Sequence, residues 1–399
     1  MRMDKEKIKE LDQKYHMNVY GERLPIAADR GEGVYLYDKN GDRYLDFAGG
    51  IAVNALGHNH PKITAAIQDQ AEKLLHASNL YYFEIQAKLA QLLVENSCAD
   101  KVFFGNSGAE ANEGALKLAR KYFKQQGEER YEVIVAEDSF HGRTLATVAA
   151  TAQEKYQKPF TPLPKGFKEA PYNDLEAIKE QITDQTAAVM VEPIQGEGGV
   201  NPADKEYLQE LRDLCDQEGI LLIFDEVQTG IGRTGSLFAY QNYGVEPDIF
   251  TSAKALGNGV PISCLLARGS VAEGFDPGDH ASTFGGNPLA CRTAYTAVQT
   301  ILEEGLVEQA AEMGDYFKEE LTELAEKYDW IEEVRGKGLL LGVEVGDRAK
   351  EIMAKMRAEG ILILVAGKNV LRFAPPLIIS KDQVDTVITA LDKVSSEVE

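Results

Sequence analysis

The middle of the chain alternates short apolar runs with amphipathic helical segments, and this alternation constrains the fold more than any other feature. The run 220–224 holds no polar residue, which is typical of a central strand covered on both faces. It follows an amphipathic helical segment, 207–218, that Gly219 closes. Other strand-like runs are 101–105, 131–136, 187–191, 248–252 and 262–267. Strands separated by helices predict an α/β fold with a mostly parallel central sheet covered by helices.

The two ends of the chain differ from this middle part. At the N-terminal end, a charged helix reaching to about Tyr20 precedes a predicted hairpin, 33–46, around an Asp-Lys-Asn-Gly-Asp turn. Towards the C-terminal end, a long helical stretch, 288–328, is followed by the β-prone runs 338–344, 361–364 and 370–373. We therefore expect three segments. Residues 1–55 form an N-terminal segment and hairpin that belong to a small α+β domain, residues 56–290 form a large domain, and residues 291–399 form the rest of the small domain.

The composition is that of a globular protein with a strong acidic excess. Asp and Glu number 64 against 42 Lys and Arg, which gives a formal charge of −22. Nucleic acids and anionic membranes both need a basic face, so this balance argues against either partner. No apolar run approaches the ~20 residues of a membrane helix, and no apolar secretory signal follows Met1. We expect a cytoplasmic protein without a metal site, because no metal-site spacing joins the four cysteines, Cys98, Cys215, Cys264 and Cys291.

Two ionisable residues stand where a strand is expected to end. Asp225 follows the apolar run 220–224, where a carboxylate is costly unless it meets a cation. A helix N-cap or a structural ion pair would also explain it. Lys254 stands between small residues after another strand, where loss of hydration lowers the pKa of an amine and favours Schiff-base chemistry. An ordinary surface lysine is the alternative.

A stretch of small residues, 105–111, precedes a predicted helix. Free backbone N–H groups at such a helix start suit a phosphate, although an ordinary N-cap at Ser107 would explain the pattern equally well. A phosphate seat, an acid and a lysine are together what pyridoxal 5'-phosphate requires. This cofactor binds through a lysine Schiff base, with an acid facing its pyridinium nitrogen. The combination is more specific than any one of its parts.

Two other patterns are weaker. The segment 230–235 matches the dinucleotide-binding pattern G-x-G-x-x-G, but it does not follow its strand directly and no strong helical pattern comes after it. His58 and His60 lie in a turn bounded by glycine and proline, without a third metal ligand nearby. We therefore expect neither a nicotinamide cofactor nor a metal at these places.

Several long motifs run through nearly the whole chain. Leu-Leu-Ile-Phe-Asp-Glu-Val-Gln-Thr-Gly-Ile-Gly-Arg-Thr-Gly stands at 221–235, and Ser-Ala-Lys-Ala-Leu-Gly stands at 252–257. Further motifs are 45–58, 79–82, 139–144, 192–199 and 365–375. Together they resemble the class III (ω-amino acid) pyridoxal-phosphate aminotransferases, and within that family its N-acetylornithine-using branch. The resemblance implies a fold-type I transferase, pyridoxal 5'-phosphate as cofactor, and a homodimer with shared active sites.

The resemblance also implies roles for single residues around the cofactor. Lys254 would bind it as a Schiff base and transfer the proton, and Asp225 would hold the proton on the pyridinium nitrogen. The other implied contacts are Gly108 and Ala109 with the phosphate, Phe140 and Val227 with the two ring faces, Gln228 with the ring hydroxyl, and Thr283 with the phosphate of the neighbouring subunit.

Four further residues are implied for the substrates. Arg143 would bind a carboxylate, which suits its planar guanidinium, and Ser282 would help to bind acetylornithine. Glu197 would neutralise Arg372 while acetylornithine is bound, and would release Arg372 for the α-carboxylate of glutamate. One departure from the family is Asn258, where a glycine is usual. Because Asn tolerates a left-handed backbone, we expect little effect.

The activity implied by the resemblance is a transamination in arginine biosynthesis. The δ-amino group of N2-acetyl-L-ornithine would pass to 2-oxoglutarate, giving N-acetyl-L-glutamate 5-semialdehyde and L-glutamate. Alternative donors are ornithine, succinylornithine, succinyldiaminopimelate and 4-aminobutyrate, because aminotransferases for them share the motifs. More distant alternatives are an aminomutase, a decarboxylase or a non-catalytic α/β binding protein.

Overall fold

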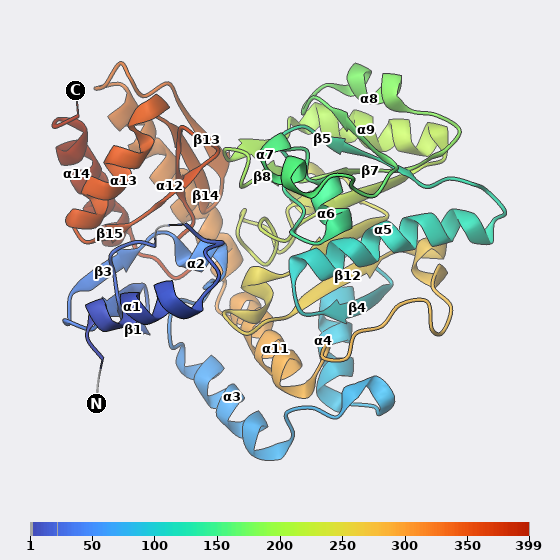
Figure 1. Ribbon diagram of the computed structural model, residues 1–399, viewed down its shortest axis with the longest axis horizontal. Coiled ribbons are helices and arrows are strands. Elements are labelled where there is room, and N and C mark those ends of the chain that lie inside the picture. The colour runs from blue at the N-terminus through green and yellow to red at the C-terminus, as the bar shows by residue number, and fades with distance from the viewer. Residues whose placement is uncertain (1–2, 22, 399) are drawn as a thin grey trace.

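A seven-stranded sheet forms the centre of the larger part of the molecule (Figure 1). The computed structural model describes residues 3–21 and 23–398. In spatial order the strands are β4 (Lys101–Gly105), β12 (Ser263–Ala267), β11 (Ile249–Ser252), β10 (Leu221–Asp225), β7 (Thr186–Val191), β5 (Glu132–Ala136) and β6 (Phe167–Ala170). Strand β12 is antiparallel to both its neighbours, and the other neighbouring pairs are parallel. The expected α/β fold with a mostly parallel sheet is confirmed.

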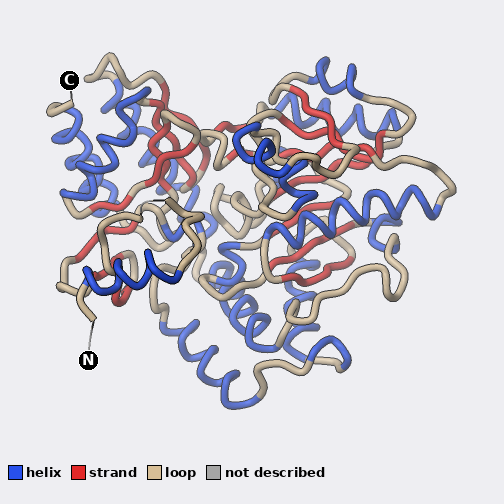
Figure 2. Tube along the Cα trace, viewed as in Figure 1, coloured by secondary structure: helices blue, strands red, loops and turns tan. Residues whose placement is uncertain are grey.

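Helices surround the strands of this sheet, as the blue and red segments of Figure 2 show. The longer helices of this part are α3 (Pro61–Lys73), α4 (Glu84–Glu95), α5 (Gly108–Gln125), α8 (Leu175–Gln181) and α9 (Lys205–Glu218). Shorter turns of helix are α2 (Gly49–Ala52), η1 (Ser78–Leu80), α6 (Leu145–Ala150), α7 (Glu154–Gln157), η2 (Lys158–Phe160), α10 (Tyr240–Tyr243), η3 (Lys254–Gly257) and η4 (Gly269–Glu273).

Alternate residues of strand β10 enter two different hydrophobic cores. Leu221 and Ile223 pack in the core that contains apolar residues of α5, whereas Leu222 and Phe224 pack in the core that contains those of α9. All five residues of β10 are buried as a result. A strand covered on both faces cannot alternate polar with apolar residues, which is why the sequence reads as one continuous apolar run.

A second, antiparallel sheet lies in the C-terminal part of the chain. Its strands in spatial order are β13 (Glu333–Lys337), β14 (Leu340–Glu344), β17 (Val370–Phe373) and β16 (Leu364–Ala366). The helices of this part are α12 (Leu306–Ala325), the short η5 (Gly346–Arg348), α13 (Ala349–Ala358) and α14 (Lys381–Ser395). Helices α12 and α13 contact strands of this sheet, and α14 contacts both of these helices.

The two ends of the chain share a further sheet. Strand β3 (Arg43–Asp46) pairs in parallel with β15 (Ile361–Leu362), and β1 (Ala28–Glu32) and β2 (Tyr35–Asp38) complete that sheet. In Figure 1 the blue N-terminal strands accordingly lie beside the red C-terminal helices. The predicted hairpin is the β2–β3 pair, whereas the charged helix α1 (Lys5–Tyr15) ends before Tyr20 and buries none of its residues. This pairing supports a small domain assembled from both ends.

The helical stretch after residue 287 consists of two helices. Helix α11 (Pro288–Glu303) packs against α3 and α4, and Gly305, with a left-handed φ of 66°, separates it from α12. The expected boundary between residues 290 and 291 falls inside α11, and the three-part domain division stays a prediction. Within the described ranges, no helix is long and apolar enough to cross a membrane.

Two short elements give no periodic signal in the sequence. Strand β6, Phe-Lys-Glu-Ala, lies at an edge of the central sheet and pairs with β5 alone, so only one of its residues is fully buried. Strands β8 (Ile194–Gln195) and β9 (Asn201–Pro202) form a two-stranded ribbon. The turn of this ribbon carries Glu197, so an element too short to be predicted positions one of the predicted site residues.

Candidate active site

A pocket of about 580 Å³ lies at the C-terminal end of strand β10, where ligands bind in parallel sheets. The predicted site residues that line it are Gly108, Ala109, Phe140, Arg143, Glu197, Asp225, Val227, Gln228 and Lys254. Arg372, Ser282 and Thr283 lie outside this lining. A larger hollow of about 1070 Å³ lies around Arg212 and Arg268, but both guanidinium groups are already paired with acids there.

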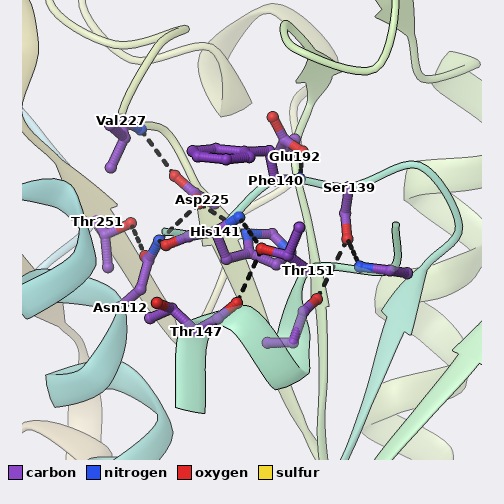
Figure 3. Close-up of polar contacts among 12 residues, drawn as sticks. Asn112, Ser139, Phe140, His141, Thr147, Thr151, Glu192, Asp225, Val227 and Thr251 are labelled. Atoms are coloured by element: carbon purple, nitrogen blue, oxygen red, sulfur yellow. Dashed lines mark hydrogen bonds and ion pairs between the residues drawn. The ribbon is translucent and has the colours of Figure 1, made fainter. Parts of the chain in front are cut away.

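The carboxylate of Asp225 is held by three neighbours (Figure 3). Asn112 Nδ2 donates to Oδ2 at 2.7 Å, His141 Nδ1 lies 2.7 Å from the same oxygen, and the Val227 N–H donates to Oδ1 at 3.0 Å. Because an ionised carboxylate only accepts hydrogen bonds, Nδ1 is the imidazole nitrogen that carries the hydrogen. These donors fix the orientation of a carboxylate that is only 4% exposed.

Asn112 and His141 are functional candidates that the sequence analysis does not single out. Asn112 lies four residues after Gly108 on α5, so the two occupy the same face of the helix. That spacing is a signal that could have identified it. His141 directly follows Phe140, but nothing in the sequence shows that its ring turns towards Asp225. Thr251 Oγ1 donates to Asn112 Oδ1 at 2.7 Å, which fixes the amide in turn.

Lys254 stands at the start of η3, directly after β11, and has a left-handed backbone with a φ of 43°. A non-glycine residue in this region carries strain of about 1–3 kcal/mol, which persists only where the surrounding structure holds it. Burial lowers the pKa of the Lys254 amine, although the nearby carboxylate of Glu197 acts in the opposite direction. The neutral, nucleophilic form of the amine is therefore more accessible here than in an exposed lysine.

The predicted phosphate seat lies at the N-terminus of α5. Ser107 is the N-cap, and its hydroxyl accepts the N–H of Glu110 at 3.3 Å, so the alternative interpretation of Ser107 as an N-cap is also correct. That cap leaves the N–H groups of Gly108 and Ala109 without an intrahelical acceptor. A Cβ atom at Gly108 would lie 2.8 Å from a methyl carbon of Val227, so a larger residue there would displace Val227 or the start of α5.

Phe140 is positioned by a buried acid, Glu192, that the sequence analysis gave no role. The Phe140 N–H donates to Glu192 Oε1 at 2.9 Å, and Tyr172 Oη donates to the backbone carbonyl of Glu192 at 2.6 Å. Burial, followed by the charge of Asp225, raises the pKa of Glu192 well above its usual value. Glu192 lines the pocket, and it holds its proton more tightly than an exposed glutamate does.

Glu197 and Arg372 form an ion pair in which Glu197 Oε1 lies 2.6 Å from Arg372 Nη1. Arg372 is 3% exposed, and it also donates to the carbonyl of Gly196 at 3.1 Å and to Gln228 Oε1 at 3.3 Å. Burial alone would raise the pKa of Glu197, but the charges of Arg372 and Lys254 outweigh it and hold that pKa below its usual value. The structure therefore brings together the two residues that the resemblance pairs.

The remaining predicted residues lie at the rim or beyond it. The guanidinium carbon of Arg143 lies 3.9 Å from the centre of the Tyr156 ring, and its side chain is exposed. Ser282 Oγ accepts from Asn106 Nδ2 at 3.1 Å, and Asn106 lines the pocket. Thr283 is exposed and makes no contribution to the pocket of its own chain.

The family profile described as "Aminotransferase class-III" matches residues 16–394. The chain belongs to the class III aminotransferases. It is 53% identical to the acetylornithine aminotransferase of Methanocaldococcus jannaschii, over 99% of this chain and 100% of that one. It is 51% identical to the acetylornithine aminotransferase of Caldanaerobacter subterraneus, over 97% and 98% of the two chains.

Solved structures agree with this membership. The ornithine aminotransferase of Toxoplasma gondii ME49 superposes with a TM-score of 0.95 at 35% identity, over 100% of this chain and 96% of that one. The acetylornithine aminotransferase of Elizabethkingia anophelis superposes with a TM-score of 0.88 at 37% identity, over 99% and 100%. The expected fold-type I architecture is therefore confirmed for this class III aminotransferase.

Class III aminotransferases depend on pyridoxal 5'-phosphate, and the pocket of this enzyme has the chemistry that the cofactor needs. The free N–H groups at the start of α5 suit a phosphate, and Gly108 leaves room only for backbone there. An amine of lowered pKa, at Lys254, and a fixed carboxylate, at Asp225, line the same pocket. These are the three features that the cofactor requires.

The weaker patterns of the sequence have structural explanations in this aminotransferase. The segment 230–235 forms turns after β10 rather than the start of a helix. His58 Nε2 lies 2.9 Å from Asp46 Oδ2, and no metal-binding cluster of acids, His and Cys occurs in residues 3–21 and 23–398. Asn258 does adopt the left-handed backbone, with a φ of 42°, and its Oδ1 accepts the N–H of Leu56 at 2.8 Å.

Proposed function

We propose that this enzyme transfers the δ-amino group of N2-acetyl-L-ornithine to 2-oxoglutarate, giving N-acetyl-L-glutamate 5-semialdehyde and L-glutamate in arginine biosynthesis. Two relatives at 53% and 51% identity are acetylornithine aminotransferases. The observation that carries the proposal is the Glu197–Arg372 ion pair beside Lys254 and Asp225. The same site has to accept N-acetylornithine and a dicarboxylate. It therefore needs a cation that is neutralised while N-acetylornithine is bound and is exposed when the dicarboxylate binds.

Five residues of the pocket are suited to bind the cofactor. The N–H groups of Gly108 and Ala109 would bind the phosphate, Phe140 and Val227 would pack on the two faces of the ring, and Gln228 would approach the ring hydroxyl. All five line the pocket. When bound, pyridoxal 5'-phosphate supplies an electron sink that stabilises negative charge on the carbon next to the substrate nitrogen.

Lys254 and Asp225 are the residues that we expect to act in the chemical step. Lys254 would hold the resting cofactor covalently. Once the substrate amine had displaced it, the freed Lys254 amine, with a lowered pKa, would accept and return the proton of the substrate carbon. Asp225, fixed by Asn112 and His141, would keep a proton on the ring nitrogen. The pair therefore accounts for a transamination that proceeds in two half-reactions.

Arg143 and Ser282 are the candidates for holding acetylornithine. Arg143 presents an exposed guanidinium at the rim, where it can form a bidentate contact with a carboxylate. In the second half-reaction, Arg372 would leave Glu197 and bind the α-carboxylate of glutamate. The buried position of Arg372 makes an unpaired charge costly there, so a carboxylate of Glu197 or of the substrate would stabilise it in each half-reaction.

We further propose a homodimer in the cytoplasm in which Thr283 completes the phosphate site of the neighbouring subunit. Thr283 is exposed, and the adjacent Phe284 is 61% exposed, so both side chains are accessible to a neighbouring subunit. Mixing Lys254→Ala and Thr283→Ala subunits tests this arrangement. A hybrid dimer has one site with both Lys254 and a partner's Thr283, so it should regain activity that neither variant shows alone. Absence of any recovery in verified hybrids would contradict the shared site.

A side-by-side donor assay tests the substrate. With 2-oxoglutarate as acceptor, N-acetylornithine, ornithine, succinyldiaminopimelate and 4-aminobutyrate are supplied in turn, and glutamate is followed. We expect N-acetylornithine to react fastest, and Lys254→Ala to be inactive with every donor. Ornithine is the second candidate, because the Toxoplasma gondii ornithine aminotransferase superposes with a TM-score of 0.95. Faster turnover of ornithine would replace the proposed donor while leaving the roles of Lys254 and Asp225 intact.

A further inference from the structure

The turn that carries Glu197 is rich in glycine. Its sequence is Gly196-Glu197-Gly198-Gly199, between strands β8 and β9. Glycine loses more conformational freedom on ordering than any other residue, so such a turn does not hold a carboxylate in place by itself. Gly199 has a left-handed φ of 135°, which other residues rarely adopt. The position of Glu197 therefore depends on contacts from outside the turn.

Gln228 Nε2 donates to the Glu197 carboxylate at 3.4 Å, and the contacts to the backbone of the turn come from the C-terminal sheet. The Gly367 N–H donates to the carbonyl of Glu197 at 3.0 Å. Arg335, on β13, donates to the carbonyl of Gly199 twice, from Nη2 at 2.8 Å and from Nε at 3.1 Å. Two bonds from one planar guanidinium fix both the position and the orientation of the acceptor.

Arg335 is itself held in place. Its Nη1 lies 2.7 Å from Glu333, its Nη2 lies 2.7 Å from Glu344, and its side chain is 13% exposed. It does not line the pocket, so it cannot touch a substrate there. Arg335 thus connects the C-terminal sheet to the turn that carries Glu197. It contacts the turn at Gly199, two residues after Glu197.

We propose that Arg335 is a positioning residue that preorganises Glu197 against Arg372 and so sets how readily this ion pair opens for a dicarboxylate substrate. The proposal rests on the two-substrate use of Glu197 and Arg372 argued above. Without Arg335, ordering the turn costs more conformational entropy each time the pair forms. The pair then opens more easily, and binding of a second carboxylate at Arg372 becomes more favourable relative to binding of acetylornithine.

The test uses the holoenzyme and three variants. Arg335→Ala removes both bonds to Gly199, Arg335→Lys keeps the charge with at most a single bond, and Glu333→Gln is the matched control that leaves Arg335 and Gly199 in contact. Glutarate, a dicarboxylate that cannot be transaminated, is titrated calorimetrically into each protein. KM and kcat are measured separately for N-acetylornithine and for 2-oxoglutarate.

We expect glutarate to bind about fivefold more tightly to Arg335→Ala, the lower end of the range for two lost hydrogen bonds, with Arg335→Lys in between and Glu333→Gln unchanged. The KM for 2-oxoglutarate should fall while that for N-acetylornithine does not. In a Glu197→Gln background, Arg335→Lys should have no further effect on glutarate affinity, because its partner in the coupling is gone. The comparison in the Glu197→Gln background uses Arg335→Lys, so it still tests the proposal if Arg335→Ala does not fold.

Three results would each overturn the proposal. They are equal changes in KM for both substrates, additive effects on glutarate affinity in the Glu197→Gln background, and unchanged glutarate binding in Arg335→Ala. The proposed function fails in a different way, since an enzyme without activity on N-acetylornithine can still show the coupling in glutarate binding.

Discussion

His141 and Asp225 are in direct contact beneath the pocket, with Nδ1 of the imidazole 2.7 Å from Oδ2 of the carboxylate. The imidazole is fully buried, and its other nitrogen, Nε2, has no hydrogen-bond partner in the part of the chain that the structure describes. Among the described residues, Asp225 is therefore the one hydrogen-bond partner of this ring, and Nδ1 is the nitrogen that contacts it.

Replacing His141 with Phe should slow the enzyme without removing its cofactor. The variant keeps an aromatic ring but loses one hydrogen bond to a charged acceptor, so kcat should fall about 10- to 100-fold. The absorbance spectrum of the bound cofactor should shift as well, because Asp225 would be less well fixed. Ser139→Ala is the control, since Ser139 is equally buried but does not touch Asp225. An unchanged kcat and spectrum would show that His141 only fills space.

Replacing Gly108 with Ala should weaken cofactor binding through a steric clash. The new Cβ would lie 2.8 Å from a methyl carbon of Val227, so either α5 or Val227 has to move. We expect the affinity of the apoenzyme for pyridoxal 5'-phosphate, measured by fluorescence titration, to fall about tenfold, the effect of roughly 1.4 kcal/mol. The double variant Gly108→Ala, Val227→Ala should recover part of the loss. No recovery would place the cause outside this contact.

Replacing Glu197 with Ala should change the balance between the two half-reactions. Arg372 would lose its 2.6 Å partner and remain available as a permanent cation. The kcat/KM of the half-reaction with glutamate should rise, and the kcat/KM of the half-reaction with N-acetylornithine should fall. The ratio of the two values should therefore shift about tenfold or more. Single-turnover kinetics with each substrate measures this ratio. Glu246→Gln, which alters a surface ion pair with Arg268, should leave it unchanged. Unaltered kinetics in both halves would rule out the exchange.

Glu226 should make the stability of the enzyme depend on pH. Burial raises the pKa of this fully buried carboxyl from 4.5 to about 7, although the N–H groups of Ala239 and Tyr240 oppose the shift. Between these two values the folded chain holds a proton that the unfolded chain has released, so raising the pH removes stability. Relative to Glu226→Gln, the free energy of unfolding of the wild type should fall between pH 4.5 and 7.

Urea denaturation at a series of pH values measures this difference. The surface variant Glu246→Gln, whose carboxylate is 59% exposed, should follow the wild-type pH dependence. A difference between wild type and Glu226→Gln that is constant or grows with pH would show that Glu226 is ionised in the folded state throughout.

Much of the large sheet could be predicted because the residue patterns of its strands are typical of buried strands. The run 220–224 is apolar at every position, since β10 is covered on both faces, and Asp225 ends it at the edge where ligands bind. The small residues before α5 and around Lys254 are likewise local features that the sequence displays directly. Strand β6 and the β8–β9 ribbon could not be predicted, because an edge strand and a two-residue strand need few apolar side chains.

The sequence by itself determined the fold class, the cofactor chemistry and nine of the residues that line the pocket, because these follow from local patterns and from motifs. Only the tertiary structure decided which side chains support them. His141 lies 84 positions from Asp225, Asn112 lies 113 positions from it, and Arg335 lies 136 positions from the carbonyl of Gly199. No local periodicity records such contacts, because the close approach of distant segments is set by how helices and sheets pack against one another.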